Sequence, residues 1–146
     1  TAKMPGLDGE KMSKSYNNFI SLREAPASVE EKVRTMQTDP ARVRLTDPGD
    51  PSNCPVFALH EVYSDDAVRD WATQGCQTAG IGCVDCKKPL IDAINAEQSI
   101  YRQRAAQFEE DPDLVNAILQ EGSEKARTIA RETMEDVKDA VGILHR

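Results

Sequence analysis

Apolar residues recur at helical spacing along most of the chain, and this pattern predicts a mainly α-helical fold. Ser28 followed by Glu31 is typical of a capping box at a helix start, and further helices are predicted to begin near Asn53 and at Ser64. The inward faces of these three helices are expected to carry Val29, Val33 and Met36, then Val56, Leu59, His60 and Tyr63, then Ala67, Val68, Trp71 and Ala72.

The pattern stays helical from about residue 86 to the C-terminus. A long helix is predicted first, with a buried stripe of Leu90, Ile91, Ile94, Tyr101, Ala105 and Phe108. Asp111 and Pro112 predict the start of a short helix that Gly122 closes, and a last helix is expected from Ser123. Its inward seam would be Ala126, Ala130, Thr133, Val137, Val141 and Leu144. We therefore predict a helical bundle.

The start of the chain has no such periodicity and predicts a mobile N-terminal loop arm. Pro5, Gly6 and Gly9 favour turns, and they precede the segment Lys11-Met12-Ser13-Lys14-Ser15. Lysines supply flexible positive charges and serines supply short donors, which suits a polyphosphate whose charge grows during a reaction. The alternative is a solvated surface loop without a ligand. Residues 19–22 then form either one strand or an extended connector.

Composition narrows the possible partners. The net charge of −7 argues against the broad affinity for nucleic acids that an excess of Lys and Arg gives, but it leaves room for a local basic patch. No apolar run approaches the roughly 20 residues of a membrane span, so no membrane partner is expected. The first residues lack the apolar core of a secretory signal, so we expect a cytoplasmic protein. Thr1 is not an initiator methionine, so we also expect a piece of a longer chain.

The four cysteines, Cys54, Cys76, Cys83 and Cys86, are spaced C-x21-C-x6-C-x2-C. In a chain of this kind such thiols are more often metal ligands or free thiols than disulfides. Four thiolates suit either tetrahedral zinc or a [4Fe-4S] cluster, and the spacing does not decide between them. The alternative is that some of them are ordinary buried thiols.

The order Lys-Met-Ser-Lys-Ser is the KMSKS signature of class I aminoacyl-tRNA synthetases. The longer string from Gly6 to Asn18 resembles the tryptophanyl and tyrosyl branch of that class. The strings Asp47-Pro48-Gly49-Asp50-Pro51 and Cys54-Pro55-Val56-Phe57 resemble bacterial tryptophanyl-tRNA synthetases and argue against the tyrosyl relative. Two other interpretations stay open, a tyrosyl-tRNA synthetase fragment and a stand-alone four-cysteine module that binds RNA or a protein.

The resemblance implies an enzyme that activates tryptophan with ATP and Mg²⁺, releases pyrophosphate and charges tRNA(Trp). It implies that Lys11 and Lys14 steady the pyrophosphate and that Ser13 and Ser15 hydrogen-bond it. Met12, as the apolar residue of the loop, would anchor its closed position. The H-x-G-H signature of the nucleotide-binding half is absent from this sequence. The chain is therefore expected to be a C-terminal fragment, inactive alone, of an enzyme that is a homodimer at full length.

Within this fragment, residues 1–25 would be the KMSKS loop and connector of the catalytic domain, and residues 26–146 the helical anticodon-binding domain. Some family members hold a [4Fe-4S] cluster on four cysteines near the region that receives the anticodon. The tRNA-binding residues would then be the basic ones near that cluster, Lys87, Lys88, Arg102 and Arg104, unless they form an ordinary solvated helix face. Arg42 and Arg44 could also reach a phosphate or a carboxylate, or simply pair with nearby aspartates.

Overall fold

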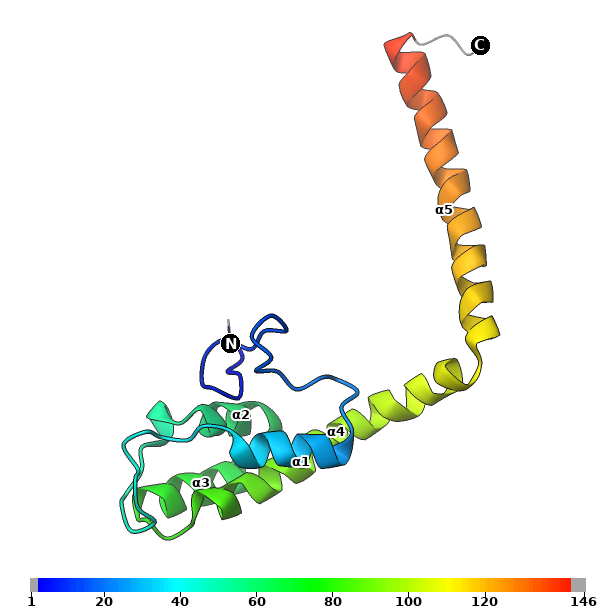
Figure 1. Ribbon diagram of the computed structural model, residues 1–146. Helices are drawn as coiled ribbons and strands as arrows, with labels where there is room; N and C mark the ends of the chain where they lie inside the picture. Colours follow the sequence, from blue (N-terminus) through cyan, green and yellow to red (C-terminus); the bar gives the residue numbers. More distant parts are fainter. Residues whose placement is uncertain (1–2, 143–146) are drawn as a thin grey trace. The chain divides into compact units, whose positions relative to one another are not determined.

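The computed structural model describes residues 3–142, which form five α-helices and one short 3-10 helix (Figure 1). These elements are α1 (Pro26–Thr35), η1 (Pro51–Asn53), α2 (Pro55–Tyr63), α3 (Asp66–Gln77), α4 (Cys83–Glu110) and α5 (Pro112–Val141). Residues 19–22 form a connector. The described residues contain no strand, although one isolated antiparallel β-bridge pairs Pro5 with Lys11. The predicted mainly α-helical class is confirmed.

Contacts divide the chain into two units, Thr1–Arg102 and Gln103–Arg146. The first unit holds a core built from α1, the Met36 that follows it, α2 and the N-terminal half of α4. Its buried members are Val29, Val33, Met36, Val56, Leu59, Leu90, Ile91 and Ile94. Met4, Leu7 and Ile20 of the N-terminal arm pack against this core, so the arm and the helices share one apolar interior. The boundary predicted between residues 25 and 26 stays a prediction.

The helix starts follow proline and aspartate more closely than the predicted capping box. α1 begins at Pro26, whose fixed φ suits the first helical turn, and the Ser28 hydroxyl donates instead to Glu24 Oε1 at 2.6 Å. α2 also begins on a proline, Pro55. α3 begins as predicted, with the Asp65 side chain accepting from Val68 N at 2.9 Å. The capping box at Ser28 was therefore the wrong start signal.

The C-terminal part departs further from the prediction. α5 is one helix that continues through Gly122, because a single glycine costs a helix only about 1 kcal/mol. It ends at Val141, and Gly142 caps it with a left-handed φ of 71°. In α4 the predicted stripe is buried at Leu90, Ile91 and Ile94, but Tyr101 and Phe108 are exposed.

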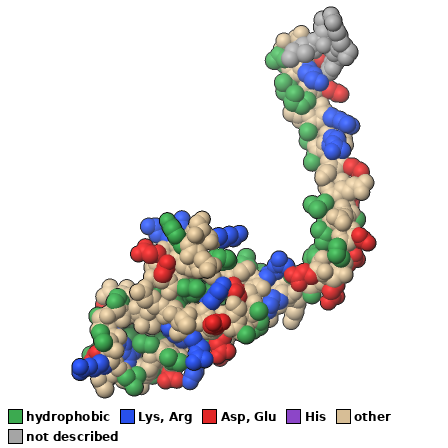
Figure 2. Space-filling model, viewed as in Figure 1, with side chains coloured by type: hydrophobic (Ala, Val, Ile, Leu, Met, Phe, Trp, Pro, Cys, Tyr) green, Lys and Arg blue, Asp and Glu red, His purple; other side chains and the backbone are tan. Residues whose placement is uncertain are grey.

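The predicted seam of the last helix is also exposed, because α5 has no buried side chain in its described part. Leu144, its last predicted member, lies outside the described residues. Figure 2 shows apolar side chains among charged ones on the surface of α5. None of the helices within residues 3–142 is long and apolar enough to cross a membrane.

Candidate functional site

The Lys11–Ser15 segment is a loop with a fixed base. The amide of Met12 donates to Met4 O at 2.9 Å, and the amide of Ser13 donates to Asn18 Oδ1 at 2.7 Å. At the other end, Asn17 N donates to Lys14 O at 3.2 Å and closes a turn. The loop therefore presents Lys14 at a turn, while its entrance is held to the protein.

The two lysines of this loop have free charges. Lys11 and Lys14 are exposed, and neither ammonium group makes an ion pair or hydrogen bond with another of the described residues. Figure 2 shows basic side chains at the surface of the N-terminal arm. Binding an anion here requires no internal ion pair to break. The ATP-binding role assigned to Lys11, Met12, Ser13, Lys14 and Ser15 stays a prediction.

All four cysteines line one small, mostly apolar cavity. Cys54 precedes α2, Cys76 lies in α3, and Cys83 and Cys86 lie in the first turn of α4. All four are free thiols, and no three of the His, Cys, Asp and Glu side chains within residues 3–142 are grouped as a metal site requires. The fold thus gathers the predicted ligands around one cavity, whereas metal binding by them is not shown.

The cavity disfavours thiolates in the absence of a cation. Burial raises the pKa of Cys86 to about 12, and the neighbouring thiols of Cys54, Cys76 and Cys83 add to this rise. Burial also raises the pKa of Cys76. A metal centre would reverse this preference, because a bound cation holds its thiol ligands deprotonated.

A half-buried arginine and a buried histidine lie beside this cavity. Arg42 donates to Ile81 O at 2.7 Å and approaches Cys83 Sγ at 3.7 Å, while its Nε is buried without a partner among the described residues. His60 Nε2 donates to Cys86 O at 3.1 Å, so its Nδ1 accepts from the Ser64 hydroxyl at 2.8 Å. Burial lowers the pKa of His60, which makes it a neutral core residue.

Lys87 belongs to the interior and not to the predicted tRNA surface. Its side chain is only 3% exposed, and Nζ donates to Arg34 O at 2.9 Å and to Met36 O at 2.6 Å, which are carbonyls at the end of α1. A helix turns once every 3.6 residues, so adjacent lysines on α4 point in different directions. This burial removes Lys87 from the residues that could reach a tRNA.

The other three predicted tRNA contacts are divided between structure and surface. Arg102 donates to Glu24 O at 3.0 Å and to Asn95 O at 3.1 Å, which ties the connector to α4. Lys88 is exposed and pairs with Asp85 at 2.6 Å, and Arg104 is exposed. Lys88 and Arg104 are therefore the two whose charges remain accessible.

Replacing Lys87 with methionine is expected to destabilise the full-length protein. Methionine fills the same space but donates no hydrogen bond, so the carbonyls of Arg34 and Met36 would lose their partner at a cost of about 1–3 kcal/mol. Lys88→Met is the matched control, because it removes the same charge from an exposed position. Thermal unfolding should show a lower midpoint for Lys87→Met alone; equal midpoints for the two variants would contradict this assignment.

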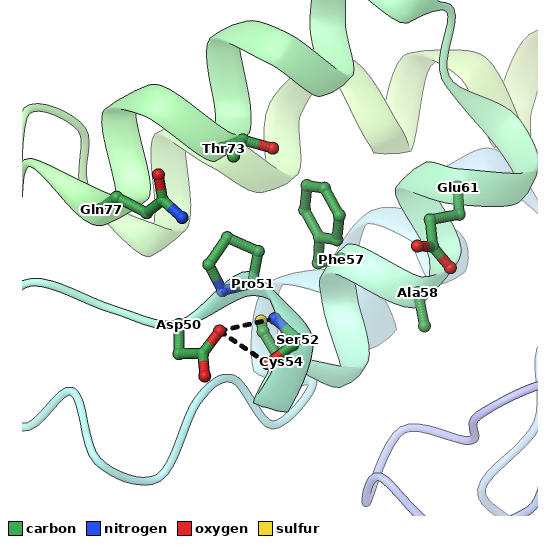
Figure 3. A pocket seen from close by; sticks show the side chains of 9 residues that line it. All are labelled: Asp50, Pro51, Ser52, Cys54, Phe57, Ala58, Glu61, Thr73 and Gln77. Atoms are coloured by element: carbon green, nitrogen blue, oxygen red, sulfur yellow. Dashed lines mark hydrogen bonds between the residues drawn. The ribbon is translucent and has the colours of Figure 1, made fainter.

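A pocket that sequence patterns did not predict lies between η1, α2 and α3 (Figure 3). Its walls are Asp50, Pro51, Ser52, Cys54, Phe57, Ala58, Glu61, Thr73 and Gln77. The Phe57 ring lies between α2 and α3, below Thr73, and Asp50 accepts from both N and Oγ of Ser52 (Figure 3). An aromatic ring with acceptors around it can stack on a base. The pocket joins two stretches of the sequence, residues 50–61 and 73–77, which is why no local pattern predicted it.

Comparisons with known proteins agree with the loop and the fold. Residues 1–99 match the protein family described as tRNA synthetases class I (W and Y). The chain is 55% identical to the tryptophan–tRNA ligase of Ralstonia nicotianae over 144 residues, which are 99% of this chain and 36% of that protein. It is 43% identical to the tryptophan–tRNA ligase of Thermotoga maritima over 143 residues, 97% of this chain and 44% of the relative.

A solved structure extends the agreement to three dimensions. The tryptophanyl-tRNA synthetase of Campylobacter jejuni, solved with ADP and tryptophan, matches with a TM-score of 0.84 and 29% identity over 98% of this chain and 44% of that one. The chain thus spans 36% to 44% of the length of these three relatives. Because the family match covers more than half of its residues, the chain belongs to the class I tRNA synthetases of the tryptophan and tyrosine branch.

Proposed function

We propose that this chain is the part of a tryptophan–tRNA ligase that supplies the ATP-phosphate loop and the anticodon-binding domain. The observation that carries this proposal is the Lys11–Ser15 loop, which has a fixed base and two lysines without internal partners. The names of the Ralstonia and Thermotoga relatives support tryptophan as the amino acid, so a tyrosyl enzyme and a stand-alone cysteine module are not favoured.

The reaction proposed for the full-length enzyme is the activation of tryptophan. A carboxylate oxygen of tryptophan attacks the α-phosphorus of Mg²⁺-bound ATP. The bond between the α-phosphorus and the oxygen that bridges it to the β-phosphorus breaks. Pyrophosphate leaves with the electron pair and gains negative charge. Lys11 and Lys14 would stabilise that charge as it develops. An interaction that is stronger in the transition state than in bound ATP lowers the activation barrier, whereas one that binds ATP equally well in both states does not. Ser13 and Ser15 would donate hydrogen bonds to the phosphates.

For tRNA(Trp), we assign the accessible charges of Lys88 and Arg104 to phosphate contacts and the Phe57 pocket to one unstacked base. Single-stranded bases are recognised by stacking on aromatic rings and by hydrogen bonds to their edges. Glu61 and Gln77 line the pocket and supply acceptors for an exocyclic amino group. Residues 26–146 would form the anticodon-binding domain of a cytoplasmic homodimer, with residues 1–25 part of its catalytic domain; family membership supports this arrangement.

We propose a [4Fe-4S] cluster on the four cysteines, with a single zinc ion as the alternative. Four thiolates suit either group, and the side chains within residues 3–142 are not gathered closely enough to hold either one as they stand. The observation that supports the cluster is that Cys54, Cys76, Cys83 and Cys86 all line one cavity. The unpartnered Nε of Arg42 also favours a negatively charged group here. When bound, the cluster would supply a cross-link between segments before α2, in α3 and in α4.

The full-length protein is expected to charge tRNA(Trp) with tryptophan. Measuring its affinity for tRNA(Trp) at several salt concentrations tests the proposed contacts. Lys88→Ala and Arg104→Ala should each weaken binding and reduce the slope of log K against log salt by about 0.7–0.9, since each removes one phosphate contact. Phe57→Leu should weaken binding by about 1–3 kcal/mol with an unchanged slope, because stacking carries no charge. Unchanged affinity and slope in all three variants would place the tRNA surface elsewhere.

A further inference from the structure

Asn18 is a buried polar residue whose side-chain oxygen and nitrogen are both hydrogen-bonded. It is 4% exposed. Its Oδ1 accepts from Ser13 N at 2.7 Å, and its Nδ2 donates to Asp8 Oδ1 at 2.7 Å and to Lys11 O at 3.2 Å. The amide oxygen therefore has a donor and both amide hydrogens have acceptors, so no polar atom of the Asn18 side chain is left without a partner. A side chain buried in this way fixes the backbone around it.

Two of these contacts lie within the phosphate loop itself. The carbonyl of Lys11 and the amide of Ser13 flank Met12, and both are bound by the same Asn18 side chain. Lys14 follows directly, and its carbonyl accepts from Asn17 N. Hydrogen bonds therefore join both ends of the backbone between residues 11 and 18. The position from which the Lys14 side chain projects depends on the Asn18 amide.

The third contact joins this loop to the turn that precedes it. Asp8 Oδ1 also accepts from Glu10 N at 3.0 Å, and the hydrogen bond from Asn18 holds the pKa of Asp8 below its usual value. Leu7 N donates to the Asn18 carbonyl at 2.9 Å. Gly6 leaves the necessary space, because a Cβ at that position would fall 2.4 Å from Asn18 Nδ2.

We propose that Asn18 is a positioning residue for the activation reaction, which holds the Lys11–Ser13 backbone so that Lys14 reaches the leaving pyrophosphate. The inference rests on the proposed function of the loop. Asn18 acts through Lys14 and does not itself touch the substrate. Its chemistry is specific, since aspartate would keep the acceptor for Ser13 but would lose both donors and set a carboxylate against Asp8.

The test separates the two half-reactions of the full-length enzyme. ATP–pyrophosphate exchange reports activation, and single-turnover transfer from preformed tryptophanyl-adenylate to tRNA needs no pyrophosphate contact. Asn18→Asp should lower kcat for exchange about 100-fold, as expected for a displaced catalytic group, with the KM for tryptophan and the transfer rate unchanged. The control is Asn116→Asp, which makes the same chemical change at an exposed position of α5, and it should leave both rates unchanged.

A second substitution provides a rescue. Combining Asp8→Asn with Asn18→Asp exchanges donor and acceptor between the two positions, and it should restore part of the lost exchange rate. If Asn18→Asp does not fold, Asp8→Ala carries the test, because it removes one partner from an exposed position. It should lower exchange by a smaller factor and leave transfer unchanged.

The possible failures are distinguishable. Equal losses in exchange and transfer for folded Asn18→Asp, or no loss in either, would overturn the positioning role. If Lys14→Ala, assayed in parallel, lowers exchange while Asn18→Asp does not, this inference alone fails. If Lys14→Ala has no effect on exchange, the proposed function of the loop fails with it.

Discussion

Lys14→Ala in the full-length enzyme is expected to lower kcat for ATP–pyrophosphate exchange roughly 100- to 1000-fold, the effect of removing one donor that stabilises transition-state charge. Lys14 lies at the turn of an anchored loop, and its ammonium group has no partner among the described residues. Because the proposed contact would strengthen as pyrophosphate leaves, the loss should appear chiefly in kcat, with the KM values for tryptophan and ATP little changed.

The matched control for this experiment is Lys125→Ala, which removes the same charge from the exposed surface of α5. It should exchange pyrophosphate at the unchanged rate. A loss in both variants would indicate a general effect of net charge, and near-normal exchange by Lys14→Ala would contradict the assigned role.

The second large effect concerns the cysteine cavity. Full-length protein purified without oxygen is expected to be brown and to contain about four irons per chain, because all four thiols line one cavity. Cys54→Ser and Cys86→Ser should each bleach the visible absorption and remove most of the iron, since each deletes one ligand. Visible spectroscopy with iron, sulfide and zinc assays provides the measurement.

Ser52→Ala is the control for these two variants, because it lies two residues from Cys54 and leaves all four thiols in place. It should keep its colour and its iron. Colourless protein with one zinc per chain would change the proposed group to a structural metal. Colourless, metal-free protein that still folds would reduce the four cysteines to packing thiols.

The elements that could be predicted from the sequence are those governed by local patterns. Val29 and Val33, or Leu90 and Ile94, are one helical turn apart and are buried as that spacing predicts. The helix end predicted at Gly122 was wrong, because the helix propensity of the residues around it outweighs the cost of one glycine. The prediction that Lys87 and Lys88 share one surface was wrong for Lys87. These neighbouring lysines on α4 lie in different environments, one buried and one exposed, and only the packing of α1 against α4 decides which is which.

The candidate site divides in the same way. The KMSKS letters and the cysteine spacing are local signals, and the fold places the former on an exposed loop and the latter around one cavity. Arg42 and Phe57 act through partners distant in sequence: Ile81 lies 39 positions after Arg42, and Thr73 lines the same pocket as Phe57, so no periodicity could predict these contacts. The side-chain partners of Asn18 lie only 5 to 10 positions away, but in loop backbone that has no periodicity. Asn18 is the last residue of the Gly6–Asn18 string, and only its burial in the structure distinguishes it from the exposed Asn17 beside it.

The measurement that tests the central claim most directly is amino-acid-dependent ATP–pyrophosphate exchange by the full-length protein. The account predicts that tryptophan supports exchange, that tyrosine does not, and that Lys14→Ala abolishes most of the tryptophan-dependent rate. Exchange supported by tyrosine, or tryptophan-dependent exchange that is indifferent to Lys14, would contradict it.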